Sequence, residues 1–179
     1  ELNLDSDRNP GNGGGRSIII ERDSLTAIAR VNGYIRSEVY DSSASILWRV
    51  NSRLGSRVIP FGNSSTEYIP FTFNLTGGTC DTLIMSTYRT PTNTNVPLPP
   101  GIPNVNSLTG VDNSLNTVDR FWYLRTIGSN VTANLTFTCT PSELGSIADP
   151  RAQCYVQPFL GWSYPIIGTQ STISNGTFV

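Results

Sequence analysis

The sequence predicts one all-β domain, an antiparallel β-sandwich of jelly-roll or Greek-key type with about ten strands and one long irregular loop. Short apolar runs alternate with turns rich in Gly, Asn and Pro, at spacings of roughly 8 to 15 residues. Hydrophobic residues make up 37% of the chain and charged residues 14%, which fits a folded domain and neither a disordered nor a membrane protein. The length of 179 residues fits a single domain over residues 1–179, in which residues 1–20 are an N-terminal extension or a donor strand.

Two short apolar runs near the N-terminus, residues 2–5 and 17–20, predict the first strands. Residues 5–11 begin like a calcium loop, but its twelfth position is Arg16, where such a loop needs a bidentate Glu. We therefore expect a polar turn there and no metal site. Asn32 and Gly33 form a strong hairpin signal and predict two strands joined at that point.

The most distinctive stretch is residues 57–74, in which Ile-Pro-Phe occurs twice. Pro60 and Pro70 lack the N–H that a β-ladder needs, so each is expected at a strand end, an edge or a bulge. The polar residues 62–65 between them predict a turn that joins two short strands. Phe71 and Phe73 alternate with polar residues, so they can share one buried sheet face. The expected core motif comprises Pro60, Phe61, Pro70, Phe71, Phe73 and Trp122.

Further strands are predicted at residues 46–50, 83–88, 118–124, 130–138, 152–156, 159–162 and 171–174, with a turn at Gly77 and Gly78. In residues 130–138 apolar and polar residues alternate, which predicts a sheet with one wet face. Residues 90–116 carry five prolines and no periodicity, so they predict a long connection that is either a crossover between two sheets or a functional loop. Residues 142–147 are too short and too Gly-broken to predict a helix.

Three cysteines permit one disulfide and leave one thiol over. Cys139 and Cys154 flank a turn-rich loop, so we expect them to pair, with Cys80 buried or pairing between chains. Three buried free thiols are the alternative.

The composition excludes several kinds of chemistry. Histidine is absent, so there is no His-based triad, metal cluster or acid–base group, and a Cys nucleophile would lack its usual partner. All 12 basic residues are Arg and the net charge is -1, so nucleic acid is not an expected partner. No stretch approaches the ~20 apolar residues of a membrane-spanning helix. We therefore expect no enzyme activity, no cofactor and no membrane span.

The large aromatic residues and Arg120 allow more than one interpretation. Six aromatic residues could stack on sugar rings if exposed, but their strand patterns favour burial: Trp48, Phe121, Trp122, Tyr123, Trp162 and Tyr164. Arg120 is expected to pair with Asp119 or Glu143, to stack on an aromatic ring, or to reach solvent from a strand edge.

Eight short motifs in order carry a family resemblance, at residues 28–38, 46–48, 58–62, 68–74, 86–90, 118–122, 133–137 with Glu143, and 152–153 with 161–162. Together they resemble the β-rich repeat modules of large secreted or cell-surface proteins of Bacteroidota, which the type IX system exports. The resemblance implies an extracellular location and no enzyme activity. The Asp-Ser-Leu and Asp-Thr-Leu sequences at residues 23–25 and 81–83 resemble sites of O-glycan attachment in Bacteroidota, which makes Ser24 and Thr82 candidate sites.

These observations lead us to expect a non-enzymatic structural module of a secreted or cell-surface bacterial protein. The module would associate with itself or with neighbouring modules, with an extracellular filament subunit as one form of this role. Residues 2–5 or 17–20 are candidate donors of a strand to an exposed edge of a neighbour. The alternative is a carbohydrate-binding or adhesive module that uses residues 90–116 and nearby aromatic side chains, with glycans as partners.

Overall fold

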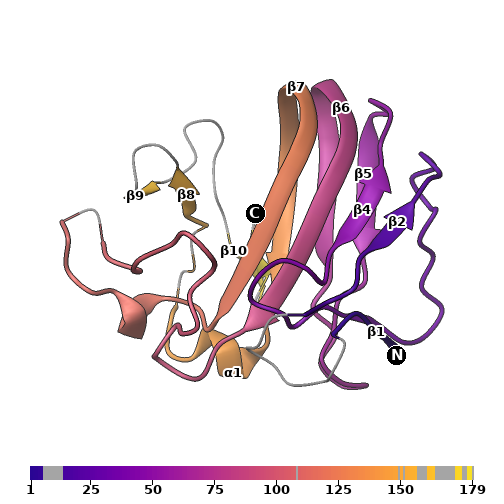
Figure 1. Cartoon of the computed structure of the whole chain (residues 1–179). Helices are drawn as coiled ribbons and strands as arrows, with labels where there is room; N and C mark the ends of the chain where they lie inside the picture. The colour runs from indigo at the N-terminus through magenta and orange to yellow at the C-terminus, as the bar shows by residue number, and fades with distance from the viewer. Residues whose placement is uncertain are drawn as a thin grey trace.

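The computed structural model describes residues 1–5, 14–107, 109–148, 150, 152–156, 161–163, 172–174 and 177–178. The described chain is mostly β, as the sequence predicts (Figure 1). Its strands are β1 (Leu2–Asn3), β2 (Ile18–Ile20), β3 (Ile35–Arg36), β4 (Ile46–Arg49), β5 (Gly55–Ile59), β6 (Phe71–Arg89), β7 (Arg120–Thr138), β8 (Cys154–Val156), β9 (Gly161–Ser163), β10 (Thr172–Ser174) and β11 (Thr177–Phe178). The helices are a 3-10 turn, Ser114–Asn116, and α1, Pro141–Leu144.

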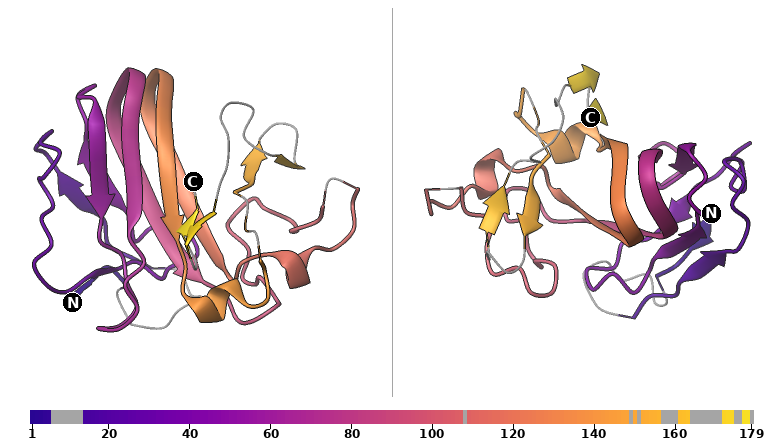
Figure 2. Two further views of the ribbon diagram at one scale, coloured as in Figure 1. Left: turned by 180° about the vertical axis from the view of Figure 1, so that it is seen from behind. Right: turned by 90° about the horizontal axis from the view of Figure 1, so that it is seen from above.

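Two strands of 19 residues, β6 and β7, form the centre of a seven-stranded sheet. They pair antiparallel along almost their whole length, and β5 and β4 share the other edge of β6. The first part of β6 pairs with β5 and its later part with β4. Both long strands arch over at one end, so the sheet is curled (Figure 1 and Figure 2). The N-terminal strands and the β8–β9 hairpin lie on opposite sides of this pair (Figure 2).

Glycines at the arch allow β6 and β7 to bend together. The register between the two strands shifts three times between residues 75 and 82. Gly78 has φ +77°, and a Cβ there would lie 1.9 Å from the carbonyl oxygen of Asn130. A Cβ on Gly128 would lie 2.0 Å from the carbonyl oxygen of Thr79. Only glycine permits such close approaches. The turn expected at Gly77 and Gly78 is therefore wrong, because these residues bend one continuous strand.

The residues of the predicted core motif lie around this sheet, with Pro70 and Trp122 half-buried. Pro60 follows the last residue of β5, and Pro70 precedes the first residue of β6, so neither interrupts a ladder. Phe61, Phe71 and Phe73 are at most 1% exposed. The main core cluster also holds Trp48, Ile59, Leu75, Leu83 and Met85.

The strand β7 also confirms its predicted alternation. Its four apolar residues from 131 to 137 pack against the core, half-buried, while Thr132 and Asn134 face solvent. Trp122 is half-buried in the same cluster, with its ring centroid 5.2 Å from that of Phe137. One face of β7 is therefore apolar and the other wet.

The N-terminal strands differ from the expected antiparallel pattern. β1 pairs with β3, and β2 with β4, in parallel. Parallel neighbours need a long crossover, which residues 21–45 supply between β2 and β4. The hairpin expected at Asn32 and Gly33 is wrong, because no strand precedes β3 in residues 21–34. Residues 1–5 and 14–20 are thus part of the fold rather than a free extension.

The long connection over residues 90–116 is irregular apart from the Asn106–Asp112 bridge and the 3-10 turn. A second cluster of Tyr88, Val105 and Phe121 anchors it. The Tyr88 hydroxyl donates to the carbonyl of Pro97 at 2.6 Å, and the Trp162 indole donates to the carbonyl of Asn104 at 2.8 Å. No helix within the described part of the chain is long and apolar enough to cross a membrane.

Candidate functional site

The most unusual constellation is a buried ion cluster centred on Arg120 at the start of β7. The side chains of Arg120, Glu38 and Glu143 are all less than 5% exposed. Arg120 donates from Nε to both carboxylate oxygens of Glu143 at 3.1 Å and from Nη2 to Oε1 at 2.7 Å. Its Nη1 donates to Glu38 Oε1 at 2.9 Å and to Thr87 Oγ1 at 3.0 Å. The expected pairing of Arg120 with Glu143 is confirmed.

Local structure holds each carboxylate in place. The amide of Arg89 donates to Glu38 Oε2 at 2.7 Å, at the end of β6. Thr140 and Glu143 form a capping box at α1, in which the amide of Thr140 donates to Glu143 Oε2 at 2.8 Å. The side-chain amide of Asn63 bridges Glu38 Oε1 and Arg120 Nη2 when its nitrogen faces Glu38. Five separate segments therefore meet at Arg120.

The electrostatics of the cluster favour its charged form. Burial alone would lower the pKa of Arg120, but Glu38 and Glu143 outweigh it and raise that pKa above its ordinary value. Burial alone would raise the pKa of Glu143, but Arg120 and hydrogen bonds from Thr140 outweigh it and lower that pKa. Such a closed cluster, with its oxygens and nitrogens bonded inside the protein, holds segments together and offers no group to a substrate.

Sequence reasoning missed Glu38 and α1. The capping box was readable, because Thr140 precedes Glu143 by three residues and Pro141 fits the first helical turn. Glu38 lies 82 residues before Arg120, and nothing near it in the sequence signals a buried carboxylate.

The two candidate glycosylation sites differ in the fold. Ser24 is half-buried in a turn, where its Oγ lies 3.2 Å from Thr26 Oγ1. Thr82 is 1% exposed in the middle of β6, and its Oγ1 accepts a hydrogen bond from Arg49 at 2.8 Å. The folded chain therefore leaves no room for a glycan on Thr82.

The expected disulfide between Cys139 and Cys154 does not form, because all three cysteines are free. Cys139 is buried beside the Arg120 cluster, where burial and then Glu143 raise its pKa to about 12. Cys154 is exposed at the start of β8, and its partner in the hairpin is Ser163. Cys80 is buried, as one of the expected arrangements had it.

Among the described residues, the seven-stranded sheet has edges without a partner strand, at β2, at β7 and on the outer side of β5. β2 ends the sheet on one side, with Ile19 52% exposed. On the other side, β11 pairs only with Phe137 and Thr138 of β7, and no other described strand pairs with that edge. A groove of about 250 Å³ lies inside the curl of β7, lined by Phe73, Leu124, Thr126, Val131, Ala133 and Leu135.

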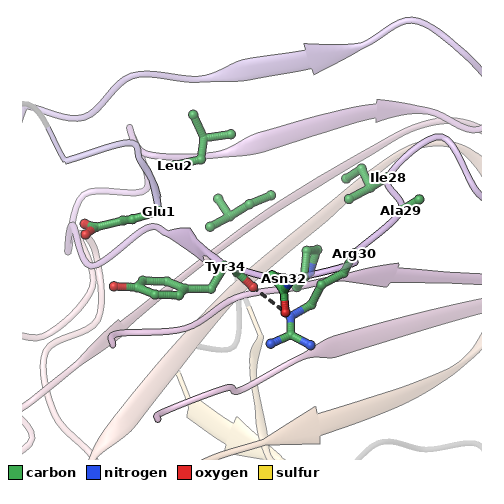
Figure 3. Close-up of a pocket in the computed structure, with 10 residues that line it drawn as sticks. Glu1, Leu2, Ile28, Ala29, Arg30, Asn32 and Tyr34 are labelled. Carbon is green, nitrogen blue, oxygen red and sulfur yellow. Dashed lines mark hydrogen bonds between the residues drawn. The ribbon is translucent and has the colours of Figure 1, made fainter. Parts of the chain in front are cut away.

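A second pocket, of about 290 Å³, lies beside β1 (Figure 3). Glu1 and Leu2 border it on one side, and the segment from Ile28 to Ile35 borders it on the other. Arg30 donates from Nε to the carbonyl of Gly33 at 2.7 Å, and its guanidinium lies 4.1 Å from the centre of the Tyr68 ring. The Arg30 guanidinium at this pocket therefore already has partners within the chain.

In the described residues, no three His, Cys, Asp or Glu side chains gather where they could hold a metal ion. The calcium-like stretch falls mostly in residues 6–13, outside the described residues. Comparisons of the chain with models of protein families, with curated proteins and with solved structures find no match. No relative therefore supplies a function, and the geometry of this chain has to support one.

Proposed function

We propose that this chain is a non-enzymatic structural module of a secreted or cell-surface protein, which associates with itself or with neighbouring modules through its sheet edges. An extracellular filament subunit is one form of this role. The observation that carries the proposal is the pair of open edges, β2 and β7, on one sheet. Unpaired edge N–H and C=O groups are a template for another strand.

The β2 edge is short, but it carries neither proline nor charge, two features that blunt edges in monomers. Its three residues are all Ile, with no Pro and no charge within the strand. Ile18 donates its amide to Ser45, on the β4 side, at 3.0 Å. Because successive amides alternate in direction along a strand, the amide of Ile19 points to the open side. A neighbouring strand can therefore pair there without disturbing the ladder within the chain.

The β-sandwich interpretation belongs to the same proposal. The curl of β6 and β7 brings apolar residues from both ends of each long strand into one cluster, which is how the facing sheets of a sandwich share a core. Structural modules need a stable fold and no catalytic groups. The enclosed Arg120 cluster supports such a role, because it holds segments together.

The carbohydrate-binding alternative has less support. Trp48 is fully buried and Phe121 is 7% exposed, so neither offers a face to a sugar ring. Trp162 is half-buried and donates its indole N–H to the carbonyl of Asn104, inside the chain. Phe121 and Trp162 fasten residues 90–116 to the sheet instead of forming a platform.

The test measures self-association of the purified chain. Light scattering over a concentration series and negative-stain electron microscopy report it. Ile19→Pro removes the outward amide and should abolish association. Ile19→Thr keeps that amide and a similar shape, so association should persist. Both variants should melt close to the original, because Ile19 donates no ladder bond within the chain. Dispersed monomers at every concentration would refute the proposal, and equal association of both variants would refute pairing through the β2 edge.

A further inference from the structure

We infer that the N-terminal segment, residues 1–21, which carries β1 and β2, can leave its place in the fold. The site that it fills then accepts the same segment from a second copy of this chain. This inference rests on the proposed function, because it names the partner in self-association. The chain's own N-terminal segment fills the site, so the structure of one chain shows how the site fits the sequence of that segment. The steps below concern the residues of the segment that the structure describes.

The segment is bound as an added strand would be. Leu2 donates its amide to Tyr34 at 3.0 Å, and Leu4 donates its amide to Arg36 at 2.9 Å. Further along, Ile18 donates its amide to Ser45. These are main-chain bonds to two different receiving strands, β3 and β4, with parallel registers. Because they depend on the segment's backbone and not on its covalent link, a second copy can make the same bonds.

Side-chain pockets give the site its selectivity. Leu4 is 2% exposed, and Ile18 and Ile20 pack against the main core cluster. Gly15 lies so close to Ala44 that a Cβ would fall 2.4 Å from the Ala44 nitrogen and 2.6 Å from its Cα. Any other residue at this position would have to displace backbone. The site therefore requires a glycine three residues before Ile18, which the segment of a second copy supplies.

The link between the segment and the rest of the chain is narrow. Trp48 donates its indole N–H to the carbonyl of Arg22 at 3.0 Å, and Arg57 donates to the carbonyl of Asp23 at 3.3 Å. Both of these donors are fully buried. They pin the chain just after Glu21, which is exposed and makes an ion pair with Arg49 at 3.5 Å. The body thus ends firmly at Arg22, and the pivot for exchange is the exposed Glu21–Arg22 bond.

The packing under β1 is incomplete, which favours release. The pocket of about 290 Å³ separates Leu2 from parts of the segment between Ile28 and Ile35, and Leu2 is 49% exposed (Figure 3). Side chains that border this open pocket have fewer protein contacts on that side, so β1 holds less firmly than the core strands. Opening is expected to start at β1 and to proceed through Leu4 to β2.

At low protein concentration the covalent link favours the form in which each chain keeps its own N-terminal segment in place. A short tether gives its own segment an effective concentration on the order of millimolar. A second copy therefore competes only when copies are crowded at similar concentrations, as they are within an array or on a surface. Cutting the tether removes this advantage and makes exchange measurable at micromolar concentration.

The experiment inserts a protease site between Glu21 and Arg22, so that the chain folds with its own segment in place. The folded protein is then cut in the presence of an excess of a fluorescent peptide of residues 1–21. Keeping the peptide present means that a body unable to stay folded alone is still captured. Fluorescence anisotropy and size-exclusion chromatography report incorporation, with two variant peptides as matched controls.

The original peptide and an Ile19→Thr peptide should both be incorporated, because Ile19 faces solvent. A Gly15→Val peptide should bind at least about tenfold more weakly, because its side chain meets the Ala44 backbone. No incorporation of any peptide, or equal incorporation of all three, would overturn the inference. If that happens while the uncut chain still associates and Ile19→Pro still abolishes association, only the exchange fails and the proposed function stands.

Discussion

Arg120→Met removes the cation that Glu38 and Glu143 share, while keeping a long side chain that fills most of the space. Arg120 donates three hydrogen bonds to Glu143, one to Glu38 and one to Thr87, besides the one from its Nη2 to Asn63. After the change Glu143 keeps the amide of Thr140 and Glu38 keeps a main-chain amide. Two buried carboxylates then lack their main counter-charge, so the variant should lose about 3–5 kcal/mol of unfolding free energy.

The assay is equilibrium unfolding in urea, with two spectroscopic probes to verify two-state behaviour. Adding Glu38→Gln and Glu143→Gln to Arg120→Met should restore part of the loss, because no buried charge is then left unpaired. A loss below about 1 kcal/mol for Arg120→Met would show that the cluster does not hold the fold. Failure of the triple variant to exceed the single one would show that unpaired charge is not the cause.

The pH dependence of stability gives an independent check, because acid should destabilise the original chain and stabilise Arg120→Met. In the original chain the pKa of Glu143 is lowered, so its stabilising effect is present above the unfolded value of about 4.3. That effect should disappear as the pH falls through the folded pKa. In Arg120→Met the burial of Glu143 dominates and raises its pKa, so this variant should gain stability as the pH falls from 7 towards 4. The same sign in both proteins would refute the electrostatic reasoning.

Three further predictions concern the core, the arch and the thiols. Phe71→Ala should cost about 3–5 kcal/mol in urea melts, because the ring is fully buried against the core; a loss below about 1 kcal/mol would contradict this. Gly78→Ala should cost at least about 2 kcal/mol, whereas Gly110→Ala, with φ +82° and no atom near its Cβ, should cost only about 1 kcal/mol; equal losses would show that the close approach is unimportant. Cys154 should react with an aromatic disulfide reagent in the folded chain, and the two buried cysteines only on unfolding, which absorbance at two urea concentrations can separate.

The sequence predicts the features of this fold that depend on neighbouring residues. Pro60 and Pro70 mark strand ends because proline removes an amide wherever it stands. The alternation of Phe71 and Phe73 predicts their common buried face, since the period of a strand is two. These are local rules, and the tertiary structure does not override them here.

Features that need two distant segments escape the same reasoning. Gly77 and Gly78 look like a turn, because a close approach of Asn130 cannot be read from residues 77 and 78 alone. Asn32 and Gly33 have the composition of a hairpin, but the segment before them lacks a partner strand in the fold. The parallel pairing of β2 with β4 depends on how residues 21–45 cross the sheet. Local turn chemistry is therefore a weaker guide than the presence of strands on both sides of it.

In the candidate site too, contacts between neighbouring residues can be predicted and contacts between distant segments cannot. The link between Thr140 and Glu143 was readable as a capping box, whereas the partnership of Arg120 with Glu38 joins residues 82 apart. Buried polar groups in proteins generally find partners, so a predicted buried Arg implies an acceptor without identifying it. Glu38 reaches the start of β7 because its amide donates to Thr87 at the end of β6, which pairs with the start of β7.

Arg57 shows how differently a buried guanidinium can be satisfied. It lies on the same face of β5 as Ile59 and is fully buried, yet it donates to main-chain carbonyls, those of Gly55, Asp23, Val50 and Arg53. Burial lowers the pKa of Arg57, in contrast to Arg120, whose carboxylates raise it. A planar fork with five donors can serve more carbonyls at once than an ammonium group, which has three. Since one of those carbonyls marks where the N-terminal segment joins the body, Arg57 fixes the fold at the point from which we expect that segment to move.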